Sequence, residues 1–118
     1  MRSIEFFNLI KTQGVQAAAK YYQDKRKSKS GIILFNENEM NSLGYSFLQK
    51  DKVKDAIEIF KLNVIAYPKS WNVYDSLGEA YLKDGQKDLA IENYKKSLEL
   101  NPNNTNAQKV LESLKSSE

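Results

Sequence analysis

The sequence contains no cysteine and no histidine. Without cysteine, disulfides, thiol nucleophiles and thiolate metal sites are excluded. Without histidine, the chain lacks the commonest general base and metal ligand among the side chains. Most familiar catalytic constellations are therefore excluded, and we predict that the chain has no enzymatic activity and holds no metal or other cofactor.

Long apolar runs and a strong net charge are also missing. No run approaches the roughly 20 apolar residues of a membrane span, and the start, MRSIEFFNLI, lacks the pattern of a signal peptide. The net charge of +3 is too small to indicate nucleic acid or an anionic membrane as a partner. We therefore expect a cytoplasmic domain with neither of these partners.

Positive charge is concentrated in one place, at Lys25, Arg26, Lys27 and Lys29. Such a cluster can form a nucleic-acid-binding or targeting patch. It can equally be a solvated helix end, where the negative end of the helix dipole stabilises cations. We favour the second interpretation because the rest of the chain is not basic.

The sequence does contain an internal repeat, because residues 37–70 align with residues 71–104 without a gap. The identical positions are Asn38/Asn72, Ser42/Ser76, Leu43/Leu77, Gly44/Gly78, Leu48/Leu82, Ala56/Ala90, Ile57/Ile91, Glu58/Glu92, Lys61/Lys95 and Pro68/Pro102. A fixed period with small, aromatic and proline landmarks is typical of a helical repeat.

Each repeat unit has the pattern of two antiparallel helices, with apolar residues at helical spacing and short links at 50–52 and 83–87. Asn36 and Glu39 have the spacing of a capping box at the start of the first unit. Pro68 and Pro102 are placed to end the second helix of each unit.

Gly44 and Gly78 fall in the middle of the first helix of each unit. Glycine there costs roughly 1 kcal/mol relative to alanine. We predict that the missing side chain lets the partner helix approach closely, helped by the small Ala56 and Ala90 on that helix. Tight packing between the helices would then offset the lost propensity.

The flanking segments supply further helices. Residues 1–35 read as a degenerate helix pair with its connection, and 105–118 as an amphipathic capping helix. Together with the repeats at 37–70 and 71–104, they predict one all-α domain, an α-solenoid of antiparallel helix pairs with about seven helices.

The pattern L-G-x-x-Y, followed by alanine, an aromatic residue and proline, resembles the tetratricopeptide repeat. The resemblance covers 37–104, and the first unit departs from the pattern at Asp51 and Asn63. It is fullest in the second unit, at Tyr74, Leu77, Gly78, Tyr81, Gly85, Ala90, Tyr94 and Pro102. The resemblance implies a superhelix that binds proteins.

The stretch YPKSWNVYDSLGEAY, preceded by GVQAAAKYY, is similar to the repeat-bearing C-terminal extension of bacterial serine hydrolases of the β-lactamase-like type. This resemblance implies that any catalysis belongs to a fused domain outside this chain. It also implies a bacterial source, and a periplasmic or exported location if the hydrolase is exported. A free-standing cytoplasmic adaptor is the alternative.

Two groups of polar residues could suggest chemistry. Ser76 beside Asp75 could be a nucleophile, but the sequence offers neither a base nor an oxyanion site for it. Asp75 and Glu79, at i and i+4, could weakly hold a cation, but no third ligand converges on them. We therefore expect no catalytic or metal-binding residues, and a solvated acidic face at these positions.

The first helix of each pair is expected to line the concave side of the solenoid. The residues there that packing does not use are predicted to bind a partner: Asn38, Asn41, Tyr45, Asn72, Asp75, Glu79 and Lys83. Asparagine amides can bond an extended peptide backbone, and an exposed tyrosine can anchor a partner. Because asparagine and acid dominate, we expect a neutral or basic ligand rather than a terminal carboxylate.

The sequence thus predicts a non-catalytic protein-interaction module, an accessory domain of a bacterial hydrolase. Its expected partner is a protein, a short peptide or a fused catalytic domain. The alternative is a structural spacer or dimerisation element without a groove ligand. A concentration-dependent mass in solution would favour a homodimer, whereas saturable capture of a short peptide would favour the groove.

Overall fold

The computed structural model describes residues 3–28 and 33–116, and within them all regular structure is helical. The helices are α1 (Ser3–Gln13), α2 (Val15–Ser28), α3 (Glu37–Gln49), α4 (Val53–Ala66), α5 (Trp71–Lys83), α6 (Lys87–Leu100) and α7 (Thr105–Ser116). The predicted all-α solenoid with seven helices is confirmed. Lys29, part of the basic cluster, lies outside the described residues.

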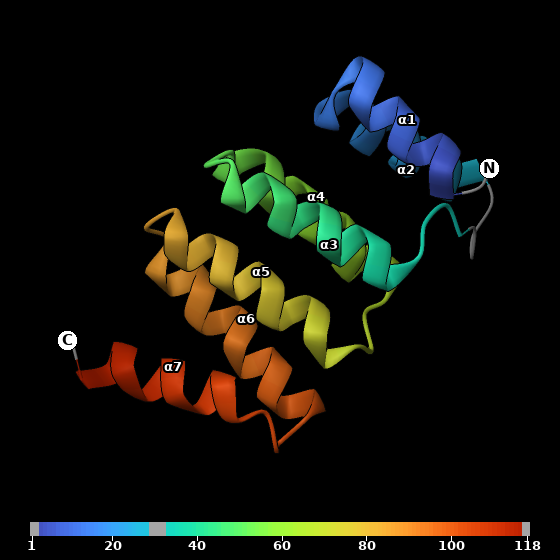
Figure 1. The fold of residues 1–118 in the computed structure, drawn as a ribbon. Helices are drawn as coiled ribbons and strands as arrows, with labels where there is room; N and C mark the ends of the chain where they lie inside the picture. The colour runs from blue at the N-terminus through green and yellow to red at the C-terminus, as the bar shows by residue number, and fades with distance from the viewer. Residues whose placement is uncertain (1–2, 29–32, 117–118) are drawn as a thin grey trace.

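The helices stack as antiparallel pairs in an elongated molecule of 44 × 28 × 20 Å. Figure 1 shows α1, α3 and α5 side by side, with α2 and α4 behind α1 and α3, α6 below α5, and α7 at the end of the stack. We call the surface formed by α1, α3 and α5, which is turned toward the viewer, the front face.

Local sequence signals explain where the repeat helices begin and end. Asn36 Oδ1 accepts the backbone N–H of Asn38 at 2.8 Å and of Glu39 at 3.2 Å, so it caps α3 as predicted. Pro68 and Pro102 each follow closely after the second helix of a pair. Their fixed φ and missing N–H prevent the helix from continuing.

Both mid-helix glycines lie against an aromatic ring from the partner helix, as predicted. A methyl group added at Gly44 would collide with the ring of Phe60. The same group at Gly78 would come within 3.0 Å of the ring of Tyr94. Both rings are almost completely buried, so the glycines allow each helix pair to close around an aromatic core.

The two helical hairpins also turn in the same way. Gly85 has a φ of +79°, and Asp51, at the equivalent position of the first unit, has a φ of +62°. This left-handed conformation ends a helix at little cost for glycine but strains a residue with a side chain. Asp51 therefore adopts the backbone that the glycine at the second turn adopts without strain.

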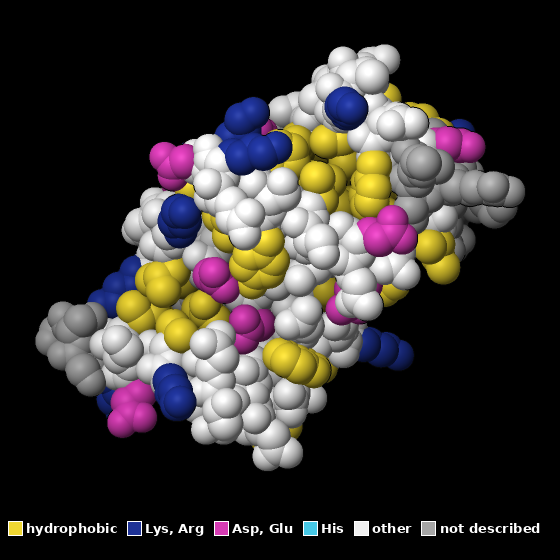
Figure 2. All heavy atoms as spheres, viewed as in Figure 1, with side chains coloured by type: hydrophobic (Ala, Val, Ile, Leu, Met, Phe, Trp, Pro, Cys, Tyr) yellow, Lys and Arg dark blue, Asp and Glu magenta, His cyan; other side chains and the backbone are white. Residues whose placement is uncertain are grey.

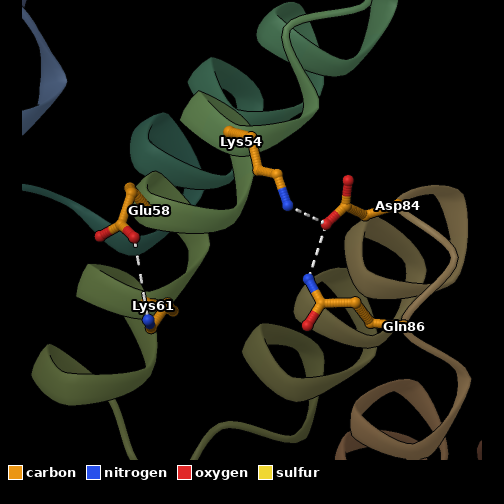
Figure 3. Close-up of polar contacts among 5 residues, drawn as sticks. All are labelled: Lys54, Glu58, Lys61, Asp84 and Gln86. Carbon is orange, nitrogen blue, oxygen red and sulfur yellow. Dashed lines mark hydrogen bonds and ion pairs between the residues drawn. The ribbon is translucent and has the colours of Figure 1, made fainter.

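The two regular pairs join closely, since both α3 and α4 pack against α5. Figure 3 shows a polar tie at this junction, where Lys54 Nζ on α4 donates to Asp84 Oδ2 at 2.6 Å. Gln86 Nε2 donates to the same oxygen at 2.6 Å, and Glu58 and Lys61 form a weaker pair within α4 at 3.8 Å. The Lys54 ammonium, followed by the Gln86 hydrogen bond, holds the pKa of Asp84 below its usual value.

The N-terminal pair joins the stack differently, because α2 packs against α4. One residue, Gly14, with a φ of +92°, separates α1 from α2. The connection before α3 then buries Phe35 against the rings of Phe6, Tyr22 and Tyr67. This aromatic cluster joins both helices of the N-terminal pair to the end of α4.

Candidate protein-interaction face

The residues predicted to bind a partner lie on α3 and α5, the helices that form most of the front face. Asn38 is exposed at the start of α3, and Asn72 is half-buried at the start of α5. The other members of the set form hydrogen bonds within the molecule, which the sequence pattern did not reveal. Their role in binding a partner stays a prediction.

Two of these hydrogen bonds join α3 to α5. The Tyr45 hydroxyl donates to Glu79 Oε1 at 3.0 Å, and the tyrosine ring packs edge-on against Phe60. Ser76 Oγ donates to Asn41 Oδ1 at 2.6 Å. The structure therefore brings Tyr45 and Glu79 together, and the two hydrogen bonds hold α3 and α5 in a fixed relative position.

A third hydrogen bond joins α5 to the end of α3; we call the line of contact between α3 and α5 the front-face seam. Lys83 Nζ donates to the backbone carbonyl of Leu48 at 3.1 Å. Lys83 follows Glu79 at the i, i+4 spacing, at which the two side chains could form an ion pair. Because the ammonium instead binds the end of α3, it does not pair with Glu79.

Asp75 is buried, with 8 % of its surface exposed, so the expectation of a solvated acid at this position was wrong. Its carboxylate accepts Asn104 Nδ2 at 2.8 Å and Asn106 Nδ2 at 3.2 Å. Asn104 also accepts the backbone N–H of Ala107 and so caps α7. The side chains at the start of α7 thus cover Asp75, a tertiary contact that the spacing on α5 alone cannot predict.

Ser76, which we considered as a nucleophile, is buried and donates its hydroxyl hydrogen to Asn41. In the described part of the chain, no three acidic side chains come close enough to hold a metal ion. Nor is any helix there long and apolar enough to cross a membrane.

A shallow depression of about 480 Å³ lies between α1 and α3, where the sequence predicted only one site residue. Its lining residues are Phe7, Asn38, Glu39, Ser42 and Leu43. Figure 2 shows hydrophobic side chains gathered between these two helices on the front face. Spacing within the repeat does not point to this depression, because α1 lies outside the repeat; the signal that could have found it was the apolar Phe7 on α1, which is only partly buried against the core.

Negative charge collects near the middle of the front face. Burial is the main cause that raises the pKa of the Tyr45 phenol to about 12; the interaction with Ser76 opposes it, and the charges of Glu79 and Asp75 add smaller increases. Burial also raises the pKa of Tyr94, and the charges of Asp75 and Glu79 add to that shift. Both phenols therefore sense a negative potential, because a nearby negative charge disfavours the phenolate.

The repeat pattern has a match among known families. Residues 76–104 match the family model of the tetratricopeptide repeat. The match covers the second predicted unit from the middle of its first helix. A curated relative carries the same repeat in its name, the tetratricopeptide repeat domain-containing protein PYG7, chloroplastic, of Arabidopsis thaliana. It is 27 % identical over 107 residues, which are 91 % of this chain and 36 % of PYG7, so the chain spans about a third of that protein.

Solved structures show the same fold. A mutant of MamA superposes with a TM-score of 0.67 and 22 % identity, covering 95 % of this chain and 79 % of MamA. The first tetratricopeptide repeat domain of Spaghetti (RPAP3), bound to the HSP90 peptide SRMEEVD, gives a TM-score of 0.65 and 18 % identity. That match covers 98 % of this chain and 88 % of the neighbour. The stacked pairs of this chain are therefore a tetratricopeptide-like solenoid.

Proposed function

We propose that this chain is a non-catalytic module that captures a short peptide, or an extended segment of a partner protein, on its front face. Tetratricopeptide folds typically mediate protein–protein interaction, and the RPAP3 neighbour is bound to a peptide. Helical solenoids use their extended faces in this way because stacked helices present rows of side chains. The depression between α1 and α3 is the observation that carries the proposal.

The depression suits a peptide side chain better than a small molecule. It is open, and it is lined by the apolar Phe7 and Leu43 together with the polar Asn38 and Ser42. A single apolar anchor could bury surface there, at about 25 cal/mol per Å², while the exposed Asn38 amide could bond the peptide backbone. One shallow site gives weak binding, so we expect useful affinity only with linkage or repetition.

Multivalent display of a random peptide library on phage tests this function, because display amplifies weak binding. The wild-type chain should enrich a set of sequences. Ser42→Arg, which places a long side chain at the edge of the depression, should abolish that enrichment without changing the melting temperature. Gln16→Arg adds the same charge to an exposed position on α2 and should enrich the same peptides as wild type.

Two other outcomes would contradict the proposal. If the library yields no enriched sequence, the module does not take short peptides. If it yields none and the mass in solution rises with protein concentration, the spacer or dimerisation alternative replaces it.

A role as an accessory domain of a bacterial hydrolase, and with it the location in the cell, is a finer proposal that rests on the resemblance of YPKSWNVYDSLGEAY. An antibody raised against this chain would test it by the size of the native product. A band well above 13.6 kDa would support a fused domain as the first partner. A band at 13.6 kDa would support a free adaptor instead.

A further inference from the structure

The apolar depression and the acidic centre of the front face are joined along α3. Asn38, Ser42 and Tyr45 are spaced so that they share one side of that helix. Asn38 and Ser42 line the depression, and Tyr45 reaches across to Glu79 on α5. Neighbouring helices lie about 8–10 Å apart, so a few residues of extended chain would span both features.

Glu79 has hydrogen-bonding capacity left over. Its side chain is exposed, and one carboxylate oxygen accepts the Tyr45 hydroxyl. A carboxylate has about four acceptor positions, so several remain. The cation nearest to it on the same helix face, Lys83, is held at the carbonyl of Leu48.

The charge of this face is not balanced within the described residues. The ion pairs that the structure forms involve Asp24, Asp84, Glu58 and Glu99, all outside the front-face seam. Figure 2 shows acidic side chains over the middle of α5 and near the start of α3, with Lys and Arg toward the margins. The charges of Glu79 and Asp75 also contribute to the raised pKa of Tyr45, although burial is the main cause of that rise.

We infer that the peptide taken by this face is cationic, with an apolar side chain in the depression between α1 and α3 and a nearby Lys or Arg that donates to Glu79. This inference rests on the proposed function. A charge-assisted hydrogen bond at an exposed carboxylate adds modest affinity. It also strongly favours a positively charged peptide side chain over a negatively charged one, because a like charge there is repelled. The RPAP3 neighbour differs, since its peptide SRMEEVD carries three acidic residues.

The same phage library identifies the chemistry of the ligand. Among peptides enriched on the wild-type chain, we expect Lys and Arg to be over-represented roughly threefold beside an apolar residue, and Asp and Glu to be depleted, as sign complementarity requires. Enriched peptides that are neutral or acidic would overturn this inference and leave the proposed function standing. A library with no enriched peptide would overturn both.

A matched pair of variants then assigns the contact. One enriched basic peptide and its Lys→Gln form are titrated into the labelled protein and followed by amide NMR shifts. On the wild-type chain the Gln form should bind roughly 5–10 times more weakly, the size expected for one such pair. On Glu79→Gln the two peptides should bind alike, whereas Glu92→Gln, an exposed acid on α6, should keep the wild-type difference. An unchanged preference in Glu79→Gln would reject Glu79 as the recognising group.

Discussion

The two regular helix pairs, α3–α4 and α5–α6, reach one backbone arrangement with different side chains. In both, a mid-helix glycine faces an aromatic ring, yet Gly44 is in closer contact with Phe60 than Gly78 is with Tyr94. In both, the hairpin turns through a left-handed residue, Asp51 in one pair and glycine in the other. The first pair therefore leaves less room at its glycine, and its turn contains a strained non-glycine residue.

A third equivalent position shows the same difference. Ser97 Oγ donates to the carbonyl of Trp71 at 2.8 Å, and Asn63 Nδ2, its counterpart in the first pair, donates to the carbonyl of Glu37 at 3.1 Å. Ser97 also accepts Asn104 Nδ2, whereas Asn63 Oδ1 is buried without a partner among the described residues. In both pairs a side chain on the second helix donates to a backbone carbonyl at the start of the first helix. The repeat keeps this hydrogen bond, while the residue that forms it differs between the pairs.

The largest expected effect is at Gly44, and Gly78 is its matched comparison. Gly44→Ala should destabilise the chain by about 2 kcal/mol, because a collision costing about 3 kcal/mol outweighs roughly 1 kcal/mol of regained helix propensity. Gly78→Ala should be close to neutral, because its ring needs to move by only a few tenths of an ångström. Urea unfolding measures both, and equal destabilisation of the two variants would contradict the difference in packing.

The next effect is an exchange at the serine and asparagine positions. Ser97→Asn should cost about 1.5 kcal/mol, because a larger side chain enters a fully buried site. Asn63→Ser should be nearly neutral, because removing the unpartnered Oδ1 offsets the packing that is lost. Chemical denaturation measures the free energy of unfolding of both variants. If Asn63→Ser destabilises the chain as much as Ser97→Asn does, the buried Oδ1 of Asn63 does not destabilise the native chain.

A smaller effect is expected at the hairpin turns. Gly85→Asp should destabilise by about 1 kcal/mol, because aspartate must adopt the left-handed conformation. Asp51→Gly should stabilise by about 0.5 kcal/mol, since relief of strain exceeds the entropy that glycine adds to the unfolded chain. Thermal unfolding of the two single variants tests this, and a destabilised Asp51→Gly would mean that its side chain contributes a favourable contact.

The smallest effect concerns the polar tie between the pairs. The pKa of Asp84 is lowered in the fold, so its contribution is present above the ordinary pKa of an aspartate and is lost as the pH falls through the folded value. Lys54→Met should therefore slightly reduce the free energy of unfolding at neutral pH. That free energy should then fall less steeply than in the wild-type chain as the pH is lowered. Because Lys54 is mostly exposed, salt should weaken the tie. An unchanged acid profile in Lys54→Met would contradict this assignment.

The fold was largely predictable because its signals are local and repeated. The alignment of 37–70 with 71–104 predicted the stacked pairs, and the cap at Asn36 predicted where α3 begins. The prediction that Gly44 and Gly78 allow close approach of the partner helix is confirmed by the nearby rings of Phe60 and Tyr94. These features depend on spacing within one unit, which the sequence carries directly.

The candidate site was less predictable because it depends on contacts between units. Helical spacing placed Asp75 among the unpacked residues, but Asn104 and Asn106 from the start of α7 cover it. It likewise gave no reason to link Phe7 to Leu43, because α1 lies outside the repeat. The partner-binding role of the predicted residues stays a prediction that the phage and NMR experiments address.

By itself, the sequence determined the helices, their pairing and the close contacts at the two glycines, because apolar spacing and turn residues act over short distances. The tertiary structure alone decided that Phe35 packs between Tyr22 and Tyr67, that an open depression lies between α1 and α3, and that Lys83 binds the carbonyl of Leu48 rather than Glu79. The physical reason is that side chains from separate units compete for the same partners, and only their positions in space decide which pairs form.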